Sequence, residues 1–239
     1  MVQVQKKHAR SMAVLCAIAV LLVVGSTVAY FSSSDEITNR FASSSFDIIL
    51  TETNWNPLAA RDVLPGDELP KNPQVINNDR TPGYIFLRVT VPADATAVDN
   101  DDGSSFGEAP EHVPLYKFMV WNGDSPASYS VDSSFSAAQR VRSSQWIALG
   151  SPSYRAADQS YVYVYAYSTN GSTLSPLREG ETTEPLFDRL QLWNFNESID
   201  LEQNHSVLVE AFGIQADLPG YSASQLEAIW TLASGGGGG

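Results

Sequence analysis

The sequence has 239 residues, with 14 Lys and Arg, 27 Asp and Glu, and one cysteine. The formal net charge of −13 excludes a nucleic-acid-binding protein, because phosphate binding needs clustered basic side chains. A single cysteine excludes both a disulfide framework and a cysteine-based zinc site. The length fits one large domain or two small ones.

The first 29 residues have the parts of an export signal. Three basic residues, Lys6, Lys7 and Arg10, precede an unbroken apolar run over residues 12–24. Small residues follow, and Ala29 stands just before the aromatic Tyr30. This order is typical of a secretory signal peptide, and it predicts cleavage between Ala29 and Tyr30.

The alternative is a signal that is retained as a membrane anchor. Counting the apolar run on to Phe31 gives roughly the 20 residues that a spanning helix needs. We expect cleavage, after which the mature chain has no stable membrane insertion. Cleavage would remove Cys16, and the loss of three basic residues would take the formal net charge from −13 to −16.

The mature chain has the pattern of an all-β protein. Short runs rich in Val, Ile, Tyr and Phe alternate with Pro, Gly, Asn, Asp and Ser clusters, which is the signature of strands and turns. The expected strands are Phe46–Thr51, Val75–Asn77, Tyr84–Val91, Leu115–Trp121, Tyr161–Tyr167, Leu186–Trp193 and Ser206–Ile214. They predict a single antiparallel β-sandwich, jelly-roll-like, over residues 46–232.

Near the end of this domain, residues 222–230 predict a short helix. Ser222 would cap it, and Leu226, Ile229 and Trp230 would face the core. Residues 233–239 form a glycine-rich tail that we expect to be flexible.

Four tyrosines alternate with smaller residues in the run Tyr161, Tyr163, Tyr165 and Tyr167. At the period of a strand, their rings share one face of the sheet. Such a face could stack against sugars or peptides. More often it is half-buried, with hydroxyl groups reaching water, and we favour that interpretation.

The composition of residues 93–114 predicts an acidic surface loop. Asp99, Asp101 and Asp102 offer clustered hard oxygen atoms, so calcium is a possible ligand. The loop lacks the closing acidic residue of an EF-hand frame, which favours a solvated acidic loop. We expect no other cofactor.

Four further patterns follow one another along the chain. The first is the small-residue cleavage junction, with an aromatic pair, an acidic patch and Asn-x-Phe over residues 25–41. The second is Pro65-Gly66-Asp67, then Lys-x-Pro-x-Val-x-Asn over residues 71–77 and an Arg-containing strand over residues 84–89. The third joins the tyrosine run to residues 177–187, and the fourth joins residues 209–216 to residues 228–230.

In order and spacing, this set resembles the TasA/camelysin family of secreted proteins of Gram-positive bacteria, and it is closer to the camelysin-like branch. The resemblance implies an alternate signal peptidase of the SipW type as a processing partner. It also implies a location in the extracellular matrix or at the cell surface, and a biofilm-matrix or surface fibre as the assembled form.

In such a fibre, the N-terminal segment of one subunit adds as a strand to the sheet of the next, by donor-strand complementation. The candidate donor is residues 30–45, in which Tyr30, Phe31, Ile37 and Phe41 could fill pockets of a neighbour. Head-to-tail contacts of this kind do not close, so they give filaments. The alternative is that the segment pairs within its own chain.

Camelysin-type proteins are catalogued as metalloendopeptidases, which makes a secreted metalloendopeptidase an alternative function. A zinc peptidase needs histidine ligands, commonly in an HExxH helix. The three histidines, His8, His112 and His205, are far apart and have no such context, and no G-x-S-x-G motif occurs. We therefore expect no catalytic residues. A monomeric adhesin that binds carbohydrate through the tyrosine face is the third possibility.

Overall fold

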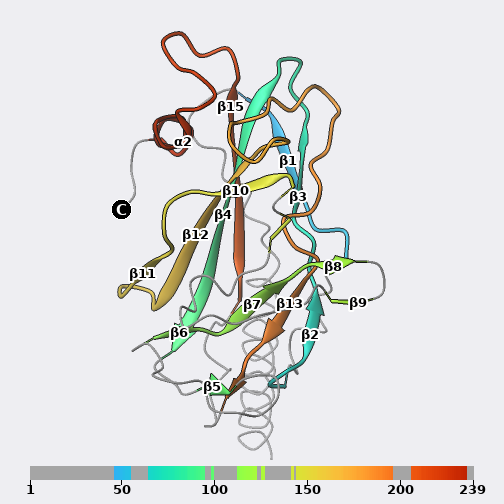
Figure 1. Ribbon diagram of the computed structural model, residues 1–239, viewed down its shortest axis with the longest axis vertical. Coiled ribbons are helices and arrows are strands. Elements are labelled where there is room, and N and C mark those ends of the chain that lie inside the picture. The colour runs from blue at the N-terminus through green and yellow to red at the C-terminus, as the bar shows by residue number, and fades with distance from the viewer. Residues whose placement is uncertain are drawn as a thin grey trace, which may run out of the picture. The chain divides into compact units, whose positions relative to one another are not determined.

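The computed structural model describes residues 46–54, 64–94, 98–99, 112–122, 125–126, 141–142, 144–195 and 206–235. Within these ranges nearly all regular structure is β-strand, and one short helix lies near the C-terminal end (Figure 1). This confirms the predicted all-β class. The strands are β1 (Ile48–Thr51), β2 (Glu68–Pro70), β3 (Gln74–Asn77), β4 (Gly83–Asp94), β5 (Val98–Asp99), β6 (Val113–Pro114), β7 (Tyr116–Met119), β8 (Trp121–Asn122), β9 (Ser125–Pro126), β10 (Trp146–Ala148), β11 (Ser153–Arg155), β12 (Ser160–Tyr167), β13 (Arg189–Leu192), β14 (Asn194–Phe195) and β15 (Leu208–Gln215), and the helix is α2 (Leu226–Ala233).

Strand β4 is the centre of the main sheet. It pairs antiparallel with β12 on one side and with β15 on the other, and β10 and β11 pair with the far side of β12. Its β-branched and aromatic residues fit a pleated surface that is covered on both faces. The inward side chains, Ile85, Leu87, Val89 and Val91, are fully buried. The expected central position of this apolar run is therefore confirmed.

A second layer covers the inner face of this sheet. It contains β13 between β2 and β7, together with the antiparallel pair β1 and β3. Alternate side chains of these strands, such as Leu69, Phe118 and Leu190, join one hydrophobic core with the inner side chains of β4 and β12. Two antiparallel layers around one core form the predicted β-sandwich.

Helix α2 covers the outer face of the main sheet. Ile229 is fully buried, and Trp230 packs against Phe86 and Phe212 at centroid distances of 5.5 and 5.0 Å. The expected helix is present, but it begins at Leu226, and the expected cap at Ser222 is wrong. Gln225 precedes the first turn, and its side-chain carbonyl accepts the backbone N–H of Ser222 instead.

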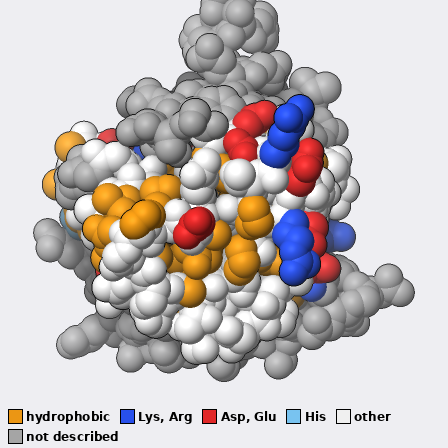
Figure 2. Space-filling model, turned by 90° about the horizontal axis from the view of Figure 1, so that it is seen from above, with side chains coloured by type: hydrophobic (Ala, Val, Ile, Leu, Met, Phe, Trp, Pro, Cys, Tyr) orange, Lys and Arg blue, Asp and Glu red, His pale blue; other side chains and the backbone are white. Residues whose placement is uncertain are grey.

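The described part of the chain contains no helix that is both long and apolar enough to cross a membrane. On the face seen from above, hydrophobic side chains gather in a patch beside acidic and basic groups (Figure 2). Large apolar side chains that remain exposed among the described residues include Ile49, Tyr221 and Leu232.

The acidic segment is shorter than the sequence predicts. Strand β4 continues through Ala93 and Asp94, which pair with Pro114 and Val113 of β6. Both ends of the predicted loop therefore belong to strands. Ala93 is buried and Asp94 half-buried, so alternation along the strand outweighs the polar composition that suggested a loop at this point.

The Pro65-Gly66-Asp67 segment forms the turn that its composition predicts. Gly66 has φ of 86°, a left-handed conformation that favours glycine. The N–H of Asp67 donates to the carbonyl of Leu64 at 2.9 Å, and the Asp67 carboxylate accepts the N–H of Leu64 at 2.9 Å. This closed turn positions the start of β2.

Candidate functional site

The candidate metal ligands do not converge in the part of the chain that the structure describes. Within the described ranges, no group of three or more His, Cys, Asp or Glu side chains is placed to hold a metal ion. Asp99 lies in β5, opposite Asn194. Asp101 and Asp102 lie outside the described residues, so calcium binding there remains a prediction. His8 and His205 also lie outside them.

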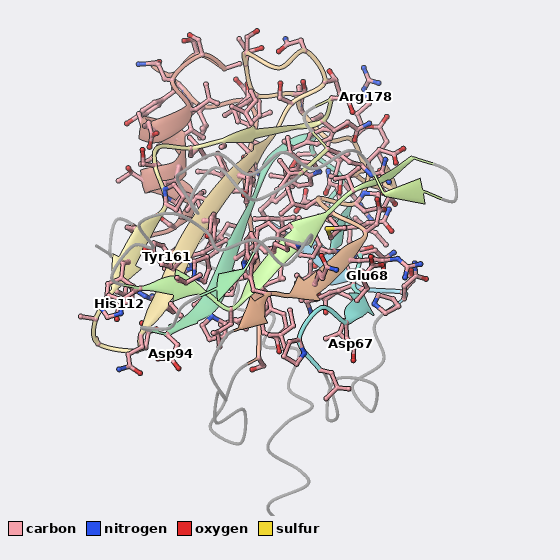
Figure 3. The ribbon with its side chains drawn as sticks, turned by 60° about the horizontal axis from the view of Figure 1, so that its bottom comes forward. Asp67, Glu68, Asp94, His112, Tyr161 and Arg178 are labelled. Carbon is pink, nitrogen blue, oxygen red and sulfur yellow. The ribbon has the colours of Figure 1, made fainter. Side chains whose placement is uncertain are left out.

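His112 is packed against aromatic residues. Its ring stacks on Tyr154 at 4.1 Å with an interplanar angle of 13°. Its backbone carbonyl accepts the hydroxyl of Tyr161 at 3.1 Å. Figure 3 places His112, Tyr161 and Asp94 at the same end of the main sheet, away from Asp67 and Glu68 on the β2 side. Through these contacts His112, which precedes β6, packs β6 against β11 and β12. This structural role explains the position of the ring.

The four alternating tyrosines lie on the inner face of β12. Tyr163, Tyr165 and Tyr167 are buried in the main core, and Tyr161 is partly buried. Tyr163 packs edge-on against Phe118 at 5.4 Å, and Tyr167 packs against Trp146 at 5.8 Å. The face is more deeply buried than the half-buried sheet expected from the sequence. Three of the four rings are therefore covered by the second layer in this fold.

Tyr165 makes the fold sensitive to alkaline pH. Burial, with a smaller contribution from neighbouring Tyr163, raises the pKa of Tyr165 well above its usual value of 10.0. The unfolded chain then ionises first, so stability is full below about pH 10 and falls as the pH rises toward the folded pKa, at up to about 1.4 kcal/mol per pH unit. In urea unfolding at pH 8 to 11, Tyr165→Phe should lose less stability than the unaltered protein. The exposed Tyr221→Phe should follow the unaltered curve, and a Tyr165→Phe curve that does so as well would contradict this account.

Phe46 is buried in the core of the sandwich, two residues before β1. Its ring lies over two glycines on the paired strands β4 and β15. A Cβ added at Gly83 would lie 1.9 Å from Phe46 Cζ, and one added at Gly213 would lie 2.7 Å from Phe46 Cδ1. No larger side chain fits at either glycine while the ring stays in place. The sequence pattern does not predict this contact, although a glycine inside a strand pattern is a signal of close approach.

Strand β15 ends the main sheet in the described part of the chain. It pairs with β4 along eight residues, and no described strand pairs with its other side. Leu208, at its first position, is 42% exposed. Among the edge strands, β2, β7 and β10 have three or four residues each, so β15 is the longest described edge. A long edge strand is a template for pairing with another strand.

The start of β1 lies close to the edge strand β15. Ile48, two residues after Phe46, also approaches Gly213, because a Cβ added there would lie 3.1 Å from Ile48 Cγ2. The start of β1 therefore packs against β15. The candidate cleavage and donor residues Ala29, Tyr30, Phe31, Ile37 and Phe41 all lie outside the described residues.

One nearly buried ion pair lies beside β1, and one partly exposed pair joins β4 to β15. Lys71 Nζ lies 2.7 Å from Glu52 Oε1, with both side chains nearly buried, just beyond the end of β1. Desolvation lowers the pKa of Lys71, and the charge of Glu52 and its hydrogen bond oppose that shift. Arg88 Nε lies 2.7 Å from Glu210 Oε2 across the pair β4 and β15. The second pair joins two residues that are registered with one another on neighbouring strands, and neither ion pair can be predicted from the local sequence pattern.

The class defined by these observations is an antiparallel β-sandwich with a long edge strand. A family model described as Camelysin metallo-endopeptidase matches residues 3–129, just over half of the chain. The chain belongs to this camelysin family, in agreement with the resemblance found in the sequence. Comparisons with curated proteins and with solved structures gave no match.

The family description names a metallo-endopeptidase activity. The metal-ligating side chains among the described residues do not fit a catalytic metal site. A catalytic zinc needs three protein ligands around one position. His112 is the one histidine in the described ranges, and its ring is stacked on Tyr154. No step of peptide hydrolysis can be derived from the side chains that the structure describes.

Proposed function

We propose that the mature chain is a structural subunit that assembles outside the cell into head-to-tail fibres, with residues 30–45 of one copy adding as a strand to another. The observation that carries this proposal is the long edge strand β15, whose outer side pairs with no described strand. The candidate donor ends at residue 45, and the next residue, Phe46, packs over β4 and β15.

Strand addition supplies the energy for assembly at this edge. An incoming strand would pair its backbone N–H and C=O groups with those on the outer side of β15 and bury its own apolar side chains. Because the donor of each copy is used by the next copy, the contact does not close on itself and a filament results. An export signal that is still attached would keep residues 30–45 from acting as a free donor, which would hold the precursor as a monomer.

The net charge opposes this association. Subunits with a formal charge of −16 after cleavage repel one another, and salt screens that repulsion over about 10 Å at 0.1 M. Assembly therefore depends on burial of the donor strand, and it should be favoured by salt.

Removal of the donor segment is the direct test. A chain that starts at Arg40 lacks Tyr30, Phe31 and Ile37, and it should stay monomeric while keeping the melting behaviour of the sandwich. A chain that starts at Tyr30 should form filaments in negative-stain electron microscopy. Filaments of equal length and number from both chains would contradict the proposal.

Single cysteines locate the acceptor edge. The chain that starts at Tyr30 has no cysteine, because Cys16 precedes it. A mixture of Ile37→Cys and Leu208→Cys subunits, treated with a short bis-maleimide, should give a cross-linked dimer of unlike subunits. A mixture with Ala157→Cys, an exposed residue on the far side of β12, should give far less. Equal yields would reject β15 as the acceptor.

The family description supports a second function, a secreted metalloendopeptidase. The same preparation distinguishes the two. Dispersed monomers that cleave an unfolded protein substrate, and that stop when a chelator is added, would favour the peptidase over the fibre subunit.

A further inference from the structure

An Asn-Gly turn follows β12 and holds an unusual set of hydrogen bonds. Ser168 begins the turn and is fully buried, whereas Asn170 and Gly171 are exposed. Gly171 has φ of 71°, the left-handed conformation that glycine adopts readily. Glycine also leaves its backbone nitrogen open, because no side chain shields it. The nitrogen of Gly171 and the side-chain amide of Asn170 are thus adjacent groups that can react with one another.

The side-chain carbonyl of Asn170 is surrounded by donors. Its Oδ1 accepts the backbone N–H of Ser172 at 3.0 Å and that of Thr173 at 2.9 Å. Two backbone donors on one carbonyl oxygen stabilise the negative charge that develops there when a nucleophile attacks the carbon. The amide Nδ2 donates to Thr173 Oγ1 at 2.7 Å, which fixes the orientation of the group that would leave.

Ser168 connects the nucleophile to the same oxygen. The N–H of Gly171 donates to Ser168 Oγ at 3.0 Å, and Ser168 Oγ lies 3.1 Å from Asn170 Oδ1, to which it donates. One buried hydroxyl therefore accepts a proton from the attacking nitrogen and offers its own proton to the oxygen under attack. This is the transfer that general acid–base catalysis of ring closure requires.

We propose that Asn170 is a site of self-catalysed deamidation. The nitrogen of Gly171 forms a bond to Asn170 Cγ, its proton passes to Ser168 Oγ, and the proton of Ser168 passes to Oδ1. The tetrahedral intermediate then collapses: the bond from Cγ to Nδ2 breaks, the proton on Oδ1 goes to Nδ2, and ammonia leaves. Water adds to either carbonyl of the resulting succinimide and opens it to aspartate or isoaspartate.

Deamidation of Asn170 would alter the packing of this turn against α2. Leu174, next to the network, is buried in the cluster under α2, and its N–H donates to the carbonyl of Ala223 at 2.9 Å. Isoaspartate adds a methylene to the backbone between Asn170 and Leu174. That insertion shifts the turn against α2 and adds one negative charge at the surface.

Peptide mapping by mass spectrometry tests the proposal on the full chain. At neutral pH, conversion of Asn170 in the folded protein should be at least about a hundredfold faster than in a synthetic peptide of residues 168–175. It should fall toward the peptide rate in Ser168→Ala, while Ser222→Ala, in another serine-containing turn, should not change it. Asn122, which also precedes a glycine, provides a comparison within the same molecule.

If the Ser168→Ala variant fails to fold, the unaltered protein unfolded in urea provides a second test. Unfolding removes the network and should slow the conversion of Asn170 to the peptide rate. If the folded protein converts Asn170 no faster than the peptide or the unfolded chain, the network protects the residue and the proposal is overturned. A Ser168→Ala variant that is folded and converts at the original rate would remove the serine from the mechanism.

Discussion

Phe46→Ala is expected to lower the free energy of unfolding by about 3–5 kcal/mol, the usual cost of truncating a buried phenylalanine. The ring is 3% exposed and fills the space over Gly83 and Gly213. Urea unfolding followed by circular dichroism measures the loss. Leu64→Ala is the matched control, because Leu64 is 66% exposed and its truncation should cost less than about 0.5 kcal/mol.

A second substitution tests whether the glycine is required by the ring itself. Gly83→Ala should cost about 1–3 kcal/mol, because the added Cβ forces Phe46 out of its position. In the Phe46→Ala background the same change should cost much less, since the ring is gone. Costs that simply add in the double variant would show that the ring does not require a glycine at position 83.

The loss of Phe46 also bears on assembly. Phe46 directly follows the proposed donor segment and packs over β4 and the proposed acceptor strand β15. A folded Phe46→Ala chain should therefore form fewer filaments than the unaltered chain at the same concentration. This effect is distinct from stability, because it is measured well below the melting temperature.

Glu52→Gln is expected to have the second large effect, a loss of about 3–5 kcal/mol. The change leaves the buried ammonium of Lys71 without the carboxylate 2.7 Å away. It also removes the interactions that oppose the lowering of the Lys71 pKa, so that pKa falls further. Because the folded pKa is then further below the unfolded value of 10.5, the deficit should shrink as the pH rises toward 10.5.

Glu68→Gln is the control for this prediction. Glu68 faces Arg189 at 3.3 Å, but both side chains are partly exposed, so the pair should contribute about 0–1 kcal/mol. The double variant Glu52→Leu with Lys71→Met should recover much of the stability, because neither charge is then buried. Equal losses for Glu52→Gln and Glu68→Gln in urea unfolding at pH 7 would refute the account.

The sequence predicts those parts of the fold that depend on local pattern. The unbroken apolar run of residues 84–91 predicts a central strand, and β4 is central because both of its faces are covered. The Pro-Gly-Asp turn follows from the conformations that those residues allow. The C-terminal helix follows from the spacing of Leu226, Ile229 and Trp230, although its start does not, because Gln225 competes with Ser222 at the N-terminus.

The parts that could not be predicted depend on residues far apart in the sequence. Alternation places the tyrosines of β12 on one face, but nothing local to residues 161–167 says that a second layer covers it. The contact of Phe46 needs Gly83 and Gly213 on two different strands. The pair of Lys71 with Glu52 needs the residue after β2 to lie beside the residue after β1. Short strands such as β10 and β11 are stabilised by pairing with β12 and have weak patterns of their own.

Electron microscopy of the purified chain that begins at Tyr30, at micromolar concentration and moderate salt, tests the central claim most directly. Addition of residues 30–45 to the edge of β15 predicts filaments one subunit wide that lengthen with concentration. Particles that remain monomeric at every concentration and salt tested would contradict it.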